Sequence, residues 1–257
     1  MKVVDYLHAL LDKKRGSADD LKRRVSRYPD DGTLNDPSPF REPPLVRVLQ
    51  SNMCSPSVVR MLLDRGASVH RGAPLTVAIR NCGAITEEIV RELLLCGADA
   101  TELDKFGQSS VCHALQAGAP ASVFRLLLDG GCFPDLCRNH VSVLHCASFR
   151  PESGLSVDVF RLLLDAGANV LVAGSSGQSP LCFALRGGLD AAGLRLMLDA
   201  GVSVDACGRH ASSLVCATDQ GWGRTLRADV VRTLLLAGAA TECVNGNGWA
   251  PLHLALR

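Results

Sequence analysis

Cysteine and histidine residues gather most densely between positions 132 and 146, and these residue types are the commonest zinc ligands in proteins. The group consists of Cys132, Cys137, His140, His145 and Cys146. Its spacing, C-x4-C-x2-H-x4-H-C, matches no common zinc module. A second group is sparser still and consists of Cys207, His210 and Cys216. The sequence therefore predicts no metal site, and nothing in it indicates a bound cofactor.

Nucleophilic catalysis would need a serine beside a base, with a third group that orients the base. Ser142 precedes His145 by one helical turn, but the sequence offers no evident third partner. The glycine-rich stretch 174–177 lacks the lysine and the strand-to-helix context of a phosphate-binding loop. We therefore expect a protein that is not an enzyme.

Charge and cysteine usage restrict the partners and the compartment. The 257 residues include 27 basic and 26 acidic side chains, a formal net charge of +1. This balance predicts no binding to nucleic acid or to an anionic membrane surface. No apolar run approaches the roughly 20 residues of a membrane helix. The 11 cysteines are an odd number scattered through apolar segments. They favour a reducing compartment, the cytoplasm, with the nucleus as the alternative.

A run of leucines followed by glycine recurs along most of the chain. The recurring glycines are Gly66, Gly97, Gly131, Gly167, Gly201 and Gly238. In one copy, Val159, Phe160, Leu163 and Leu164 share one side of a segment that predicts a helix over 157–165. Gly167 then provides the left-handed residue that commonly ends a helix.

A second motif precedes five of the six leucine runs, and one further copy follows the last run. It reads GQSPLCFA at 177–184 and GWAPLHLA at 248–255, with weaker copies at 73–78, 107–114, 142–147 and 212–217. Each unit thus holds two helices. A helix pair of this size cannot bury its own apolar face, so neighbouring units must stack on one another.

These motifs resemble the ankyrin-repeat family, which carries G-x-T-P-L-H-x-A at the start of its first helix, over almost the whole chain. The resemblance implies an all-α ankyrin-repeat solenoid of helix-turn-helix units, about six repeats with a helical N-terminal cap. It also implies β-hairpin fingers between units, at 68–72, 101–107, 134–141, 169–177, 204–211 and 241–248. The motif threonine is replaced by serine in several copies and by Ala250, and the histidine is kept only at His145 and His253. We therefore expect uneven hydrogen bonding between repeats.

The chain divides into two regions. Residues 1–43 form an N-terminal helical cap or degenerate repeat with a connector, and Ser17 and Asp20 resemble a capping box at its second helix. Residues 44–257 form the ankyrin repeats, the last of which stops after its first helix, as expected for a piece cut from a longer protein. Five cysteines are predicted as small core residues: Cys96, Cys112, Cys146, Cys182 and Cys216.

The family resemblance implies a non-catalytic protein–protein interaction module. Such a module binds another protein through its fingers and the inner helices that line a concave groove. The candidate partner-binding residues lie in fingers or enlarged loops: Lys105, Phe106, Arg138, Asn139, Phe149, Arg150, Trp222 and Arg224. In the enlarged loop 218–227, the tryptophan either packs against a helix end or is offered to a partner, where Trp and Arg are enriched.

The irregular repeats, the helical N-terminus without the motif and the shortened C-terminus are similar to poxviral ankyrin-repeat proteins of the F-box, host-range type. That resemblance implies the target-binding part of a viral protein in the host cytosol. Such a protein recruits a host target to a Skp1–cullin ubiquitin ligase through a C-terminal segment missing here, or blocks innate immune signalling. The alternative is a stand-alone cellular ankyrin scaffold or inhibitor, or a SOCS-box-type ligase adaptor.

Overall fold

The computed structural model describes residues 17–26, 35, 42–81, 83, 86–104, 106–136, 143, 156–171, 179–186, 188–205, 212–218 and 226–256. Within those ranges the regular structure is helical, and no strand is present. In the same ranges, no helix combines the length and the apolar character needed to cross a membrane.

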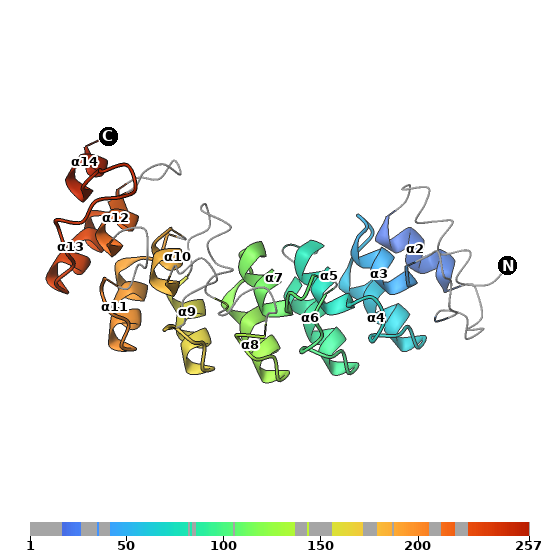
Figure 1. Cartoon of the computed structure of the whole chain (residues 1–257). Coiled ribbons are helices and arrows are strands. Elements are labelled where there is room, and N and C mark those ends of the chain that lie inside the picture. The colour runs from blue at the N-terminus through green and yellow to red at the C-terminus, as the bar shows by residue number, and fades with distance from the viewer. Residues whose placement is uncertain are drawn as a thin grey trace.

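The helices form two rows that run the length of the molecule (Figure 1). The outer row contains α2 (Ala18–Val25), α4 (Pro56–Asp64), α6 (Thr86–Leu95), α8 (Ala121–Asp129), α9 (Val157–Asp165), α11 (Ala191–Asp199) and α13 (Ala228–Leu236). The inner row contains α3 (Pro44–Leu49), α5 (Pro74–Asn81), α7 (Ser110–Ala117), α10 (Pro180–Arg186), α12 (Ser213–Thr218) and α14 (Pro251–Ala255). An inner helix and the outer helix that follows it form one unit.

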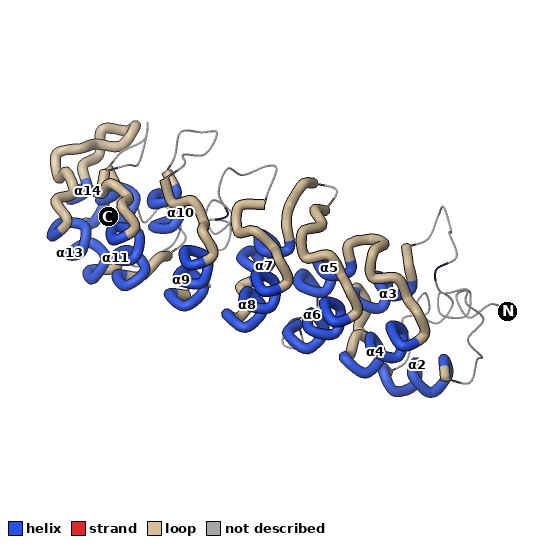
Figure 2. Tube along the Cα trace, turned by 90° about the horizontal axis from the view of Figure 1, so that it is seen from below, coloured by secondary structure: helices blue, strands red, loops and turns tan. Residues whose placement is uncertain are grey.

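Contacts run between neighbouring units, as a stacked solenoid requires. In the outer row α4 contacts α6, α6 contacts α8 and α9 contacts α11, while in the inner row α5 contacts both α3 and α7. Seen from below, the units stand side by side along the chain (Figure 2). The prediction of an all-α ankyrin-repeat solenoid is confirmed.

Helix α9 and the residues that end it show how the sequence sets local structure. The helix predicted over 157–165 is α9, with those bounds. The amides of Gly167 and Ala168 donate to the carbonyls of Leu164 and Leu163 at 2.9 and 2.8 Å. Gly167 has φ +88°, a conformation that a side chain would strain, which explains why glycine recurs at this place in each unit.

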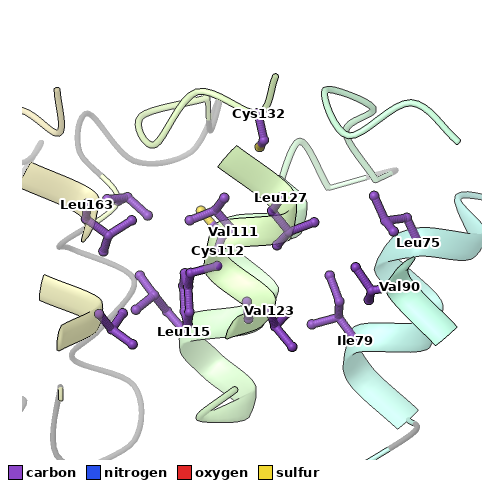
Figure 3. Packing of buried hydrophobic residues seen from close by; sticks show 14 of the residues in the cluster. Leu75, Ile79, Val90, Val111, Cys112, Leu115, Val123, Leu127, Cys132 and Leu163 are labelled. Atoms are coloured by element: carbon purple, nitrogen blue, oxygen red, sulfur yellow. The ribbon is translucent and has the colours of Figure 1, made fainter. Parts of the chain in front are cut away.

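The outer helices supply most of the bulk of the core. Of the ten largest fully buried side chains, all except Leu45 and Leu49 of α3 lie in outer helices, including Phe124 and Phe160. Burial of such a side chain contributes about 1.5–3 kcal/mol. In Figure 3, Ile79 and Val90 extend toward the α7–α8 pair, and Leu163 approaches that pair from the other side. Each interface between units is therefore part of one continuous core.

The cysteine prediction is correct for three positions and wrong for one. Cys112, Cys182 and Cys216 are buried. Cys96 is exposed because it follows Leu95, the last residue of α6, where the chain has already left the packed face. Cys146 lies outside the described residues.

Two of the predicted hairpin fingers, at 101–107 and 241–248, contain hydrogen-bonded tight turns. In the last one, the amide of Asn245 donates to the carbonyl of Trp249 and the amide of Gly248 donates to that of Asn245, both at 2.9 Å. Two bonds close a turn without extending into a ladder, so the described part of the finger contains no strand.

Candidate functional site

The inner helices leave one side open. Helix α5 contacts α6 within its unit and α3 and α7 on either flank, so three of its sides are covered. On the fourth side Val77, Arg80 and Asn81 are half-buried or exposed, at i, i+3 and i+4. We call this stripe of the inner helices, together with the turns that join the units, the open face. Its half-buried or exposed helical residues include Arg47, Val77, Arg80, Asn81, Gln116, Phe183 and Arg186.

One finger of the open face is held by a buried carboxylate. Oδ1 of Asp104 accepts hydrogen bonds from the amides of Phe106 and Gln108 at 2.8 and 2.9 Å. Its Oδ2 lies 2.9 Å from Nε2 of His113 on α7. The side chains of His113 and Asp104 are only 5% and 10% exposed. Phe106, by contrast, is 60% exposed beside this fixed turn.

The bonds that fix the turn also change the acidity of Asp104. Burial acts to raise the pKa of this carboxyl, but the amide of Gln108, the His113 ring and the amide of Phe106 together lower it. The carboxylate is therefore ionised at neutral pH, and its oxygens are occupied by groups of the same finger and of α7.

A second finger repeats the turn without the histidine. Oδ1 of Asn245 accepts from the amides of Asn247 and Trp249 at 3.0 and 2.9 Å. The Trp249 ring packs edge-on against His253, with ring centroids 6.2 Å apart. Leu254 stands where the first finger has His113. Only the first of these two fingers is thus tied to its inner helix by a side-chain hydrogen bond to the turn residue.

Polar side chains also link one turn to the next. Asp135 accepts from the amides of Val143 and Asn169 at 2.7 and 2.6 Å. The Asp205 carboxylate accepts from the amide of Ala240 at 3.1 and 3.3 Å. These carboxylates hold neighbouring turns in fixed positions relative to one another along the open face.

Serine hydroxyls cap the N-termini of several inner helices. Hydroxyl contacts between units, by contrast, form at some of the described interfaces and not at others. Ser109, Ser179 and Ser212 stand at the motif threonine and each accepts from the amide three residues later, as helix caps do. Thr76 and Ser110 place their hydroxyl oxygens 3.5 Å apart across two units. The hydroxyl of Ser213 is buried and has no hydrogen-bond partner in the described part of the chain.

Of the predicted partner-binding residues, the structure places Phe106 on the open face. The other seven lie outside the described residues and stay predictions: Lys105, Arg138, Asn139, Phe149, Arg150, Trp222 and Arg224.

The cysteine–histidine group at 132–146 gains no support from its described member. Cys132 is buried, and burial raises the pKa of its thiol to about 11, so the thiol is protonated at neutral pH. The other four members lie outside the described residues. Where the chain is described, no three His, Cys, Asp or Glu side chains are arranged to hold a metal ion.

His113 is a site residue that was not predicted from the sequence. The signal was present: Asp104 begins a D-x-x-G turn, and the comparable turn at Asn245 is followed by leucine where the first has histidine. Alignment of these two turns would have identified the added contact.

Comparisons with known proteins agree with this architecture. A family model described as ankyrin repeats (3 copies) matches residues 75–173. The human ASB11 ankyrin repeat domain is similar in structure, with TM-score 0.64 and 21% identity, covering 82% of this chain and 91% of that one. The ankyrin repeat domain of Bcl-3, a member of the IκB family, gives TM-score 0.52 and 24% identity over 82% and 92%. No curated protein matched the sequence.

Residues 75–173 thus match the ankyrin-repeat family model, and the described part of the chain has the ankyrin-repeat fold. Ankyrin repeats indicate a protein–protein interaction module rather than a catalytic one.

Proposed function

We propose that the chain is a recognition module that binds a partner protein through its open face. The observation that carries the proposal is the finger at 104–108, where the buried Asp104–His113 pair fixes a turn beside an exposed aromatic ring, Phe106. A side chain displayed on a rigid turn loses little conformational freedom when it binds.

Exposed apolar side chains continue along the turns of the next two units. Phe133 follows α8 and Leu171 follows α9, and both are exposed. Single exposed apolar residues are common on protein surfaces. Their recurrence in three successive turns, starting at Phe106, supports a contact surface that runs from unit to unit.

The predicted residues outside the described ranges extend this proposal. Lys105 belongs to the Phe106 finger, and Arg138 and Asn139 belong to the next finger. Phe149 and Arg150, with Trp222 and Arg224, belong to two enlarged loops between helices. Trp and Arg supply much of the binding energy at interfaces, so the pair at 222 and 224 is proposed as a second anchor.

Affinity capture from cell lysate tests this assignment. Phe106→Ala and the double variant Trp222→Ala/Arg224→Ala are compared with wild type and with Arg125→Ala on the outer helix α8. Loss of one anchor of about 2 kcal/mol reduces affinity roughly 30-fold, so recovery of the partner should fall sharply. Undiminished recovery with both open-face variants would contradict the assignment.

The narrower proposal is that the bound protein is a target delivered to a Skp1–cullin ubiquitin ligase, in the cytoplasm or nucleus, by a viral protein or by a cellular SOCS-box-type adaptor. It rests on the sequence resemblance. Expression of the complete gene product should then lower the level of the captured protein, and a proteasome inhibitor should restore it. An unchanged level would favour the alternatives, a scaffold or a sequestering inhibitor.

A further inference from the structure

The two rows differ in charge. Each outer helix described carries at least one Asp or Glu. The six described inner helices carry neither, and their ionised side chains are Arg47, Arg80 and Arg186. The helical part of the open face is therefore cationic, although the chain as a whole is nearly neutral.

Two of these arginines have no partner among the described residues. In the described molecule Arg60 pairs with Glu92, Arg91 pairs with Glu87, and Arg227 donates to the carbonyl of Gly188. Arg80 is exposed and Arg186 is half-buried, and neither makes a hydrogen bond or ion pair within the described residues. Both lie in the last turn of a helix, where the helix dipole mildly favours a cation. The dipole interaction does not use the N–H donors of the guanidinium groups, which can still form hydrogen bonds.

Four carboxylates in the turns between units are already occupied by internal hydrogen bonds. Asp99 accepts from the amide and hydroxyl of Thr101, and these bonds lower its pKa. Asp104 accepts from its own finger and lies against His113, while Asp135 and Asp205 accept from amides of the next turn. None of these four carboxylates pairs with Arg80 or Arg186 in the described residues, so both guanidinium groups can meet an external anion.

We infer that the open face binds an acidic, extended segment of the partner protein, with its carboxylates meeting Arg80 and Arg186. This inference rests on the proposed function and adds the chemistry of the partner. Guanidinium groups bind carboxylates through paired hydrogen bonds, which fixes both the register and the direction of the bound segment. Phe183, half-buried one turn before Arg186, adds an apolar surface beside the second contact.

The spacing of the two arginines sets the spacing of the acids. They lie three repeat intervals apart along the inner row, and packed helices are separated by 8–10 Å, which gives about 24–30 Å. An extended chain advances close to 3.3 Å per residue, so the two acidic positions should stand roughly seven to nine residues apart.

Nucleic acid is the other polymer that unpaired arginines could attract. The net charge of +1 and the acids on every described outer helix argue against binding to a phosphate backbone. An oligonucleotide therefore serves as a competing ligand in the test.

The test is selection from a random peptide display library, with peptides long enough to span both arginines. Three forms of the chain are compared: wild type, Arg80→Glu/Arg186→Glu, and the control Arg125→Glu/Arg195→Glu on the exposed side of α8 and α11. Peptides selected by wild type should be enriched in Asp and Glu at the stated spacing. They should bind the first variant at least about tenfold more weakly and the control equally well. Equal melting temperatures would show that all three forms are folded.

Acidic peptides that bind Arg80→Glu/Arg186→Glu as well as wild type would overturn the inference. Selected peptides without excess acid would also overturn it, while leaving the proposed function standing. Failure to select any peptide would count against both. Tighter binding of a single-stranded oligonucleotide than of the selected peptides would replace the acidic protein segment by nucleic acid.

Discussion

The outer and inner rows of helices share one core but contribute differently to it. The outer row holds the large buried rings Phe124 and Phe160, while the inner row buries small side chains such as Cys112 and Ala114. The array bends with the inner helices on the inside of the curve (Figure 1). Acids lie on every described outer helix and are absent from the described inner ones. We therefore expect the outer row to contribute more to stability, while the inner row also displays side chains on the open face.

Truncation of one buried side chain in each row tests this difference with the largest expected effect. Phe160→Ala in α9 should destabilise the protein by about 3–5 kcal/mol, because it leaves a large cavity in a fully buried site. Cys112→Ala in α7 removes one atom from an equally buried site and should cost roughly 1 kcal/mol. Urea denaturation measures both. Similar losses from the two substitutions would contradict the division between the rows.

Within the open face, His113→Leu makes the first finger resemble the second, which has Leu254. One buried oxygen of Asp104 would lose its partner, at a local cost of about 1–3 kcal/mol. Amide hydrogen exchange at Phe106 and Gln108 should accelerate, while exchange at Asn247 and Trp249 should not change. The opposite pattern, or faster exchange throughout the chain, would show that the histidine serves the core rather than the finger.

Lowering the pH should change the structure of the first finger and leave the second unchanged. The folded pKa of Asp104 is lowered from its ordinary 3.8, so its contribution to stability is present above that value and is lost as the pH falls through the lowered pKa. The amide resonances of Phe106 and Gln108 should therefore shift in acid. Asn245 does not ionise, so the resonances of its finger should stay in place.

Asp104→Asn is the matched variant, since it gives the first finger the amide found in the second. The acid shift should disappear in it. Persistence of the shift would assign the titration to another group.

The smallest effect is expected for an ion pair on the outer row. Arg60 and Glu92 lie 3.0 Å apart, with side chains 65% and 23% exposed. Glu92→Gln should cost only about 0.5 kcal/mol, because solvent screens such a pair. Partner capture should be unchanged in this variant. A loss of capture would place binding on the outer row.

Several features of the fold could be predicted because they depend on local sequence. The bounds of α9 follow from apolar spacing and a glycine, and stacking follows from recurrence. The prediction that Cys96 is buried was wrong because the leucines before it suggest that the helix continues, whereas α6 ends at Leu95. The role of Arg80 depends on which side of α5 its neighbours cover, and that information exists only in three dimensions.

Site-specific photocrosslinking tests the central claim most directly. A photoreactive amino acid replaces Phe106 or Gln116 on the open face, or Arg125 on the exposed side of α8. The account predicts that both open-face positions crosslink to the same partner protein and that position 125 does not. Crosslinking at position 125 as strong as at the other two, or at position 125 alone, would contradict it.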